Sequence, residues 1–128
     1  MAGKAKIFVV EDEEILAQSL TEYLRNESYE VEVAHDGETA LQILPTVRPD
    51  LIILDIVLPK LNGIVFLKKI QEAGSEFNNI PVIIISNLSG NKESIEQMGL
   101  HIAEYFVKTV GSLKELTAKI KSILKDNG

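Results

Sequence analysis

Four short apolar runs in this chain each end in polar or charged residues, and this pattern restricts the possible folds more than any other feature. The runs are residues 9–10 before Glu11 and Asp12, 51–54 before Asp55, 83–85 before Ser86, and 106–107 before Lys108. A short apolar run bounded by turn signals is typical of a strand buried on both faces. In open α/β sheets, ligands bind at the C-terminal ends of such strands. We therefore predict that these polar side chains meet at one edge of a parallel sheet.

Patterns typical of strands and helices alternate along the whole chain. The expected strands are 5–10, 29–34, 50–55, 80–86 and 103–107, and the expected helices are 13–26, 36–45, 62–73, 92–98 and a last helix opened by residues 111–115. The 29–34 segment alternates apolar with acidic residues, as a strand near the edge of a sheet does. Alternating strands and helices favour βαβ units, and hence an α/β three-layer sandwich around a parallel sheet.

Composition narrows the class of protein. A chain of 128 residues with 45% hydrophobic and 25% charged residues suits one domain, for which we expect the limits 1–128 and a core of 5–125. The absence of cysteine excludes disulfides and cysteine nucleophiles. The net charge of −6 argues against direct nucleic-acid binding. Neither a signal-peptide pattern nor a bilayer-spanning apolar stretch is present, so we expect a cytoplasmic protein with no membrane contact.

The acids at the first and third strand ends suggest a metal-assisted phosphoryl site. Glu11, Asp12 and Asp55 would lie close together, and carboxylates in close proximity raise one another's pKa. Mg²⁺, which prefers oxygen ligands, would relieve the repulsion between them. The metal would also polarise a phosphoryl group. Asp55 could then attack phosphorus and form an acyl phosphate, and it needs no general base because a carboxylate has no proton to lose. Lys108 and Ser86 would contact the phosphoryl oxygens.

The same residues resemble the receiver domain of two-component response regulators, and in particular stand-alone receivers of the chemotaxis type. The resemblance covers essentially the whole chain and rests, in order, on Glu11, Asp12, Asp55 with Pro59 and Gly63 after it, Ser86, and Tyr105 three residues before Lys108. It implies a flavodoxin-like fold of five βα units with strand order 2-1-3-4-5. It also implies phosphorylation of Asp55 by a histidine kinase or a phosphotransfer protein. Mg²⁺ would be held by Asp12, Asp55 and the Val57 backbone carbonyl, with Glu11 helping through water.

The resemblance further implies a conformational switch. The hydroxyl of Ser86 would move toward the phosphoryl group, and the ring of Tyr105 would turn inward. The face formed by residues 92–98, 103–107 and the last helix would then change its affinity for a downstream protein target or for a second copy of the chain. Such a domain is a phosphoacceptor and not an enzyme, although it assists its own phosphorylation and dephosphorylation.

The sequence departs from the family's pattern in three places. Thr109 replaces the proline that usually follows the lysine, and a cis bond without proline costs about 3–4 kcal/mol, so we expect a trans bond or a strained cis bond. Asn87 is bulkier than usual, and the apolar Val57 and Leu88 cannot orient an attacking water, which predicts a slowly decaying acyl phosphate. The turn at residues 99–102 is longer than usual, which predicts an altered connection to the last strand.

The other interpretations fit the sequence less well, apart from a scaffold that works without phosphorylation. Taken singly, Lys108 would be a surface lysine and Ser86 a turn or cap residue; their joint occurrence favours function. A haloacid-dehalogenase-type phosphatase would need a second aspartate where Val57 stands. A flavin-binding module would need a phosphate-binding loop where residues 11–14 are all acidic. A receiver that acts as a phosphorylation-independent scaffold fits the sequence. Because the chain stops after the last helix, we expect a stand-alone receiver or a piece of a longer regulator.

Overall fold

The computed structural model describes residues 3–108 and 111–127, and a five-stranded parallel sheet forms its middle layer. The strands are β1 (Lys6–Val10), β2 (Glu30–Ala34), β3 (Leu51–Asp55), β4 (Val82–Ser86) and β5 (Glu104–Val107). They lie in the order β2-β1-β3-β4-β5, and every neighbouring pair is parallel. The predicted flavodoxin-like order is therefore confirmed. β2 lies at one edge, as its exposed Glu30 and Glu32 indicated.

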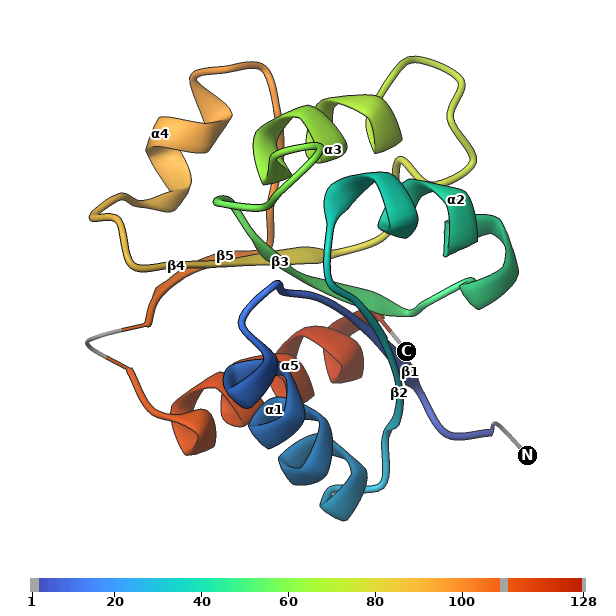
Figure 1. Cartoon of the computed structure of the whole chain (residues 1–128), viewed down its shortest axis with the longest axis vertical. Coiled ribbons are helices and arrows are strands. Elements are labelled where there is room, and N and C mark those ends of the chain that lie inside the picture. Colours follow the sequence, from blue (N-terminus) through green and yellow to red (C-terminus); the bar gives the residue numbers. More distant parts are fainter. Residues whose placement is uncertain (1–2, 109–110, 128) are drawn as a thin grey trace.

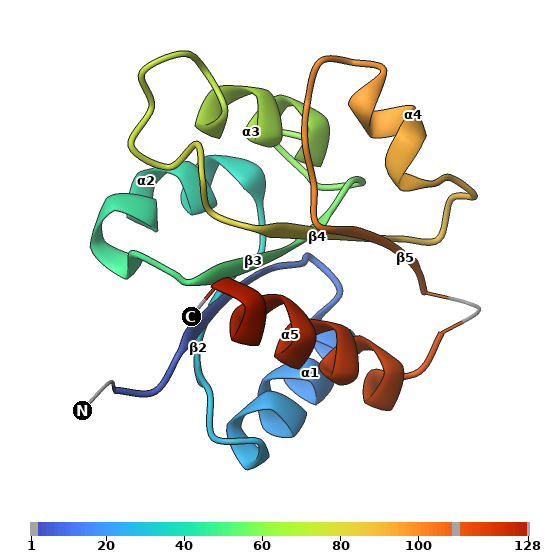
Figure 2. The ribbon, with the colours of Figure 1, turned by 180° about the vertical axis from the view of Figure 1, so that it is seen from behind.

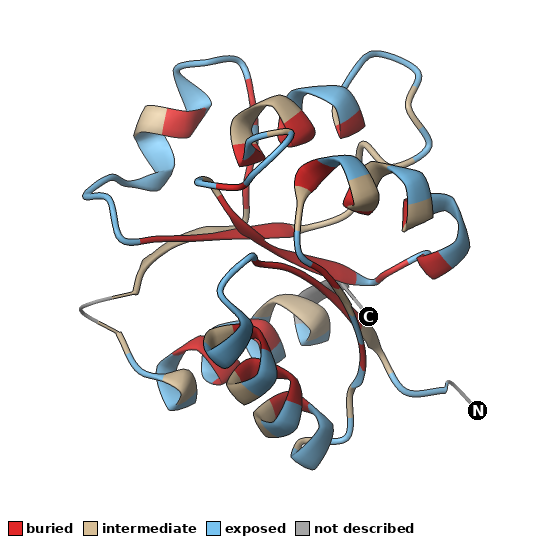
Figure 3. Cartoon of the chain, in the orientation of Figure 1, coloured by how far each residue is buried: buried red, intermediate tan, exposed pale blue. Residues whose placement is uncertain are grey.

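Helices cover both faces of this sheet (Figures 1 and 2). The helices α1 (Glu14–Asn26) and α5 (Leu113–Asn127) pack on one face, and α2 (Gly37–Val47), α3 (Gly63–Ile70) and α4 (Lys92–Glu96) pack on the other. Each face has its own buried apolar cluster. Because both faces are covered, the central strands β3 and β4 are buried along their whole length (Figure 3). This explains why they appear in the sequence as continuous apolar runs.

The helix ends differ from the predicted ones, and the differences have local causes. α2 continues past Pro45 to Val47 and ends at Arg48, which has a φ of 48°. Pro45 removes the one hydrogen bond that its N–H would donate to the Leu41 carbonyl, and the helix continues for two more residues. α3 ends at Ile70, short of the predicted residue 73. α4 ends at Glu96, short of residue 98, because Gly99 with a φ of 80° closes a turn there by donating to the Glu96 carbonyl at 3.0 Å.

The connection at residues 99–102, which the sequence predicts to be longer than usual, is fixed by two buried side chains and by hydrogen bonds to Gln71. Leu100 and Ile102 are buried, whereas His101 between them is exposed. The side-chain amide of Gln71 accepts from the His101 N–H at 3.0 Å and donates to the His101 carbonyl at 2.7 Å. This pair of hydrogen bonds joins the end of α3 to the segment that leads into β5.

Candidate functional site

The register of the sheet brings the predicted site residues together at one edge. Val10 pairs with Leu54, so Glu11 and Asp55 follow at the same level on neighbouring strands. Ser86 pairs with Val107, and the next residue, Lys108, donates its backbone N–H to the Ser86 carbonyl at 2.8 Å. The C-terminal ends of β1, β3, β4 and β5 therefore deliver the acids, the hydroxyl and the lysine to one place.

Lys108 is the cation of this site, and its amino group contacts two buried carboxylates. Nζ donates a hydrogen bond to Oδ2 of Asp55 at 2.8 Å and lies 2.8 Å from Oε1 of Glu11. Burial alone would lower the pKa of Lys108, but the hydrogen bonds and charges of Asp55 and Glu11 outweigh burial and raise it above its ordinary value. Lys108 therefore stays charged and neutralises part of the acid cluster.

Glu11 is fully buried, and its ionised form is destabilised. Burial raises the pKa of Glu11 to about 7; contact with Lys108 lowers this pKa, and the neighbouring carboxyl of Asp55 raises it again. Oε2 accepts from the Glu13 backbone N–H at 3.1 Å. Oε1 is also buried, and it lies 2.8 Å from Nζ of Lys108, the cation that partly offsets its burial. A further cation would favour the ionised form of Glu11.

The acids also match the oxygen ligands that a hard divalent cation takes. Glu11, Asp12 and Asp55 each offer a carboxylate oxygen, and these oxygens lie within 4.8 Å of one another. Asp12 is exposed, on the open side of the cluster, whereas the other two acids are buried. Oxygen-only ligands on a partly open site fit Mg²⁺, which retains several waters. Lys108 faces two buried carboxylates, those of Glu11 and Asp55, so the ionised cluster keeps a net negative charge that a divalent cation would balance.

Two glycines fix the loop that follows Asp55. The N–H of Gly63 donates to the Ile56 carbonyl at 2.8 Å. A Cβ at Gly63 would overlap the Asp55 carbonyl oxygen and lie 2.8 Å from the Ile56 Cα. A Cβ at Gly37, the first residue of α2, would overlap the carbonyl oxygen of Leu61. The loop 56–62 is therefore held by direct backbone contact with the first residues of α2 and α3.

The predicted switch residues, Ser86 and Tyr105, are joined through Leu88. Ser86 is fully buried, and its hydroxyl accepts from the Leu88 N–H at 3.0 Å. The hydroxyl of Tyr105 donates to the Leu88 carbonyl at 3.0 Å. The Tyr105 ring lies against Gly90, where an added Cβ would be 2.8 Å from the ring. The two side chains thus contact the same short segment between β4 and α4.

A hollow of about 330 Å³ opens beside Asp55. Its lining residues are Asp12, Glu13, Asp55, Val57, Asn87, Leu88 and Lys108. Glu13 was missed in the sequence, where an acid at a helix start is adequately explained by the helix dipole. Its Oε2 lies 3.7 Å from Nζ of Lys108. The run of acids at residues 11–14 was the one signal that could have drawn attention to Glu13.

The peptide bond between Lys108 and Thr109, for which the sequence predicts a trans or a strained cis geometry, lies outside the described residues.

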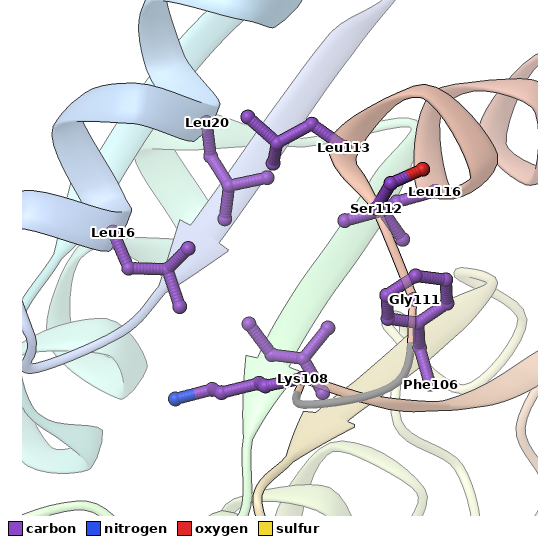
Figure 4. Close-up of a pocket in the computed structure, with 9 residues that line it drawn as sticks. Leu16, Leu20, Phe106, Lys108, Gly111, Ser112, Leu113 and Leu116 are labelled. Atoms are coloured by element: carbon purple, nitrogen blue, oxygen red, sulfur yellow. The ribbon is translucent and has the colours of Figure 1, made fainter.

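A second, apolar hollow of about 220 Å³ lies on the other side of Lys108, between α1 and the start of α5. Figure 4 shows Lys108 extended across one end of it, with the amino group directed away from Ser112. The leucines Leu16, Leu20, Leu113 and Leu116 line much of this hollow. Its apolar lining offers little to a phosphoryl group, and we assign it to the support of the lysine stem.

Comparison with known proteins places the chain in a family. The model of the response regulator receiver domain matches residues 7–121. The chain belongs to this family. Receiver domains are signalling domains of two-component systems rather than ordinary enzymes, so phosphoacceptor signalling is the general function of this family. Among the residues that the structure describes, no helix is both long and apolar enough to cross a membrane.

Individual relatives of this receiver domain agree with the assignment. The chain is 36% identical over 117 residues to YcbL, a transcriptional regulatory protein of Bacillus subtilis, and the match covers 91% of this chain and 50% of that protein. It is 35% identical to the alkaline phosphatase synthesis regulator PhoP of the same organism, covering 94% of this chain and 48% of PhoP. The receiver domain of Francisella response regulator 1452 superposes with a TM-score of 0.85 at 29% identity, over 98% of this chain and 100% of that one.

The receiver domain spans about half the length of the curated relatives given above. The family expectation is thus confirmed, whereas the finer expectation of a chemotaxis-type stand-alone protein is not, because these relatives are transcriptional regulators.

Proposed function

We propose that this receiver domain accepts a phosphoryl group on Asp55 from a histidine kinase or a phosphotransfer protein. A carboxylate oxygen of Asp55 forms a bond to phosphorus while the bond from phosphorus to the donor nitrogen breaks, and the electron pair leaves with the donor. The observation that carries this proposal is the 2.8 Å pairing of Asp55 with Lys108 at a buried strand end beside an open hollow. Lys108, which lines the hollow, would hold one oxygen of the transferred group, and the buried Ser86 would hold another after its hydroxyl moves toward the phosphoryl group.

Mg²⁺ is the cofactor that we propose for this reaction, held by Asp12, Asp55 and the backbone carbonyl of Val57, with Glu11 acting through water. When bound, it neutralises the oxygens of the phosphoryl group and of the acid cluster. The residues of the chain do the rest: Asp55 attacks, and the Val57 N–H, donating to Oδ1 of Asp55 at 3.1 Å, keeps the carboxylate oriented.

Magnesium should stabilise the folded chain, because only the folded state gathers the acids. A Mg²⁺ concentration one hundred times the dissociation constant would add about 2.7 kcal/mol to the free energy of unfolding. We expect Asp12→Asn to weaken this stabilisation, whereas Glu72→Gln, an exposed charge change far from the site along the chain, should leave it intact. Thermal unfolding over a Mg²⁺ titration measures both. An unfolding midpoint that stays the same as Mg²⁺ is added would argue against the metal site.

Phosphorylation of Asp55 would be transmitted through Leu88. The Ser86 hydroxyl would donate to a phosphoryl oxygen, and because it also accepts from the Leu88 N–H, its movement toward the phosphoryl group would displace Leu88 and break the bond from Tyr105 to the Leu88 carbonyl. Tyr105 would then turn inward, which changes the face formed by α4, β5 and α5. We propose that this face binds the downstream target and, after phosphorylation, a second copy of the chain.

We also propose that residues 1–128 form one domain with its core at 5–125, and that the protein is located in the cytoplasm.

The acyl phosphate should decay slowly, because the side chains two residues past Asp55 and two residues past Ser86 cannot orient water by hydrogen bonds. Val57 and Leu88 are apolar side chains exposed at the hollow, to 61% and 55%. Val57→Asn should shorten the lifetime roughly threefold or more by offering a hydrogen bond to the attacking water. Met98→Gln, a change at another exposed apolar residue, should leave it unchanged. Loss of the phosphoryl mass over time gives the rate. A wild-type lifetime of seconds would contradict this.

Intact-mass spectrometry after incubation with acetyl phosphate and Mg²⁺ tests the proposed function directly. We expect one added phosphoryl mass, which Asp55→Asn or EDTA abolishes. Asp50→Asn is the matched control, because it changes an exposed aspartate just before the same strand and should keep the adduct. If the folded wild-type protein gains no phosphoryl mass and also does not bind beryllofluoride, the proposal is wrong, and a phosphorylation-independent scaffold is favoured.

A further inference from the structure

Glu13 lies at the mouth of the phosphoryl hollow, although it is the residue that begins a helix. As the N-cap of α1 it has extended backbone angles, and its side chain makes no capping hydrogen bond. Its carboxylate is instead directed toward the site, with Oε2 at 3.7 Å from Nζ of Lys108. The side chain is 60% exposed, whereas that of Lys108 is 12% exposed. Glu13 is therefore the outermost of the three acids that contact the lysine.

We propose that Glu13 determines donor specificity by lowering the positive potential that Lys108 presents to incoming phosphate compounds. This inference rests on the proposed function, since it concerns phosphorylation of Asp55. A small dianion such as acetyl phosphate must be drawn in by the potential of the hollow, and a carboxylate at the mouth repels it. A donor protein docks through many contacts outside the hollow and presents its phosphoryl group in a fixed place, so one charge at the mouth is a smaller part of its interaction.

The reaction with the small donor is chemically complete. A carboxylate oxygen of Asp55 bonds to phosphorus, the bond between phosphorus and the acyl oxygen breaks, and acetate leaves with the electron pair. Glu13 gains or loses no proton in this step and contacts Lys108, not Asp55. Its effect is thus on the approach of the anion rather than on the transfer itself.

The chain provides a matched control in the next residue. Glu14 carries the same charge and lies in the first turn of α1, but it lines a different hollow with Arg25 and His35, between α1 and β2. Glu13→Gln and Glu14→Gln therefore remove one negative charge each, one residue apart, near the same helix terminus. Only the first removes the charge beside Lys108.

The experiment compares second-order rate constants for phosphorylation by acetyl phosphate at low ionic strength, with Mg²⁺ saturating for each variant. We expect Glu13→Gln to react about three- to tenfold faster than wild type, and Glu14→Gln to match wild type. The gain should shrink at high salt, because exposed charges are screened. It should also be smaller with phosphoramidate, which carries less negative charge.

Each outcome bears on the inference. Equal acceleration in both variants would show a general charge effect and overturn the role of Glu13. A Glu13→Gln rate at or below that of wild type would also overturn it, while leaving phosphorylation of Asp55 intact. No adduct in wild type or variants, with folding confirmed, would overturn the proposed function and this inference together.

Discussion

A Gly63→Ala variant is expected to lose about 3 kcal/mol or more of its free energy of unfolding, an extreme value for one added methyl group. The methyl would occupy space held by the Asp55 carbonyl oxygen and by the Ile56 backbone. Backbone atoms cannot rotate away as a side chain can, so either α3 or the end of β3 must shift. A shift of β3 would also misplace the Asp55 carboxylate.

Chemical denaturation of Gly63→Ala and Gly3→Ala provides the measurement and its control. An added Cβ at Gly3 meets no atom within 4 Å, so that variant should unfold with the wild type. If Gly63→Ala folds, its adduct yield with acetyl phosphate should fall, because Asp55 has moved relative to Lys108. A stability change below about 1 kcal/mol would show that the loop adjusts more easily than its contacts indicate.

A Lys108→Met variant is expected to lose about 3 kcal/mol of its free energy of unfolding in the absence of divalent cations, because removing the cation of a buried ion pair leaves its carboxylates uncompensated. Glu11 and Asp55 would remain buried with no cation between them, and Glu13 would lose its own contact with the amino group. Met keeps most of the apolar stem that lines the hollow shown in Figure 4, so the loss reports on charge rather than on packing.

Two further measurements distinguish this electrostatic cause. Added Mg²⁺ should narrow the stability difference between Lys108→Met and wild type, because it replaces the missing positive charge. Lys68→Met, at an exposed position of α3, should show neither the loss nor the recovery. A deficit in Lys108→Met that stays the same with added Mg²⁺ would mean that Mg²⁺ does not bind beside the unpaired carboxylates, and it would contradict the proposed metal site.

The pH dependence should agree with this cause. Glu11 binds its proton more tightly in the folded chain than in the unfolded chain, because burial raises its pKa from 4.5 to about 7. Folding is therefore favoured as pH falls through this window, and Glu11 costs stability above it. Without Lys108 the folded pKa of Glu11 would rise further, so the deficit of Lys108→Met should shrink on acidification from about pH 8 to pH 5.

The sequence predicts the fold, and the gathering of the polar side chains at one edge of the sheet, because each of these polar residues directly follows an apolar run. The positions of Asp55, Ser86 and Lys108 at strand ends follow from that pattern once the strand order is known. Contacts through backbone atoms have no such pattern, so the bonds that Leu88 makes with Ser86 and Tyr105 could not be predicted. Helix ends were misjudged where one turn decides them, as after Pro45.

Glu13 illustrates a different limit. Its identity is fully explained by the start of α1, where an acid suits the helix dipole, and nothing in the sequence distinguishes it from Glu14. The two differ only in which hollow each side chain lines. That difference depends on the path of the chain after β1, which the residue pattern does not contain.

The two loops beside Asp55 differ in how firmly they are supported. Loop 56–62 is pressed against Gly37 and Gly63, whereas residues 87–90, which include Leu88, are all exposed. An extra group on Asp55 would therefore meet close backbone packing on the α2–α3 side, and on the α4 side a segment held by the hydrogen bonds of Leu88 to Ser86 and Tyr105. Hydrogen bonds of an exposed segment rearrange without repacking a core, so a protein bound near α4 would be expected to sense the chemical state of a carboxylate that it never touches.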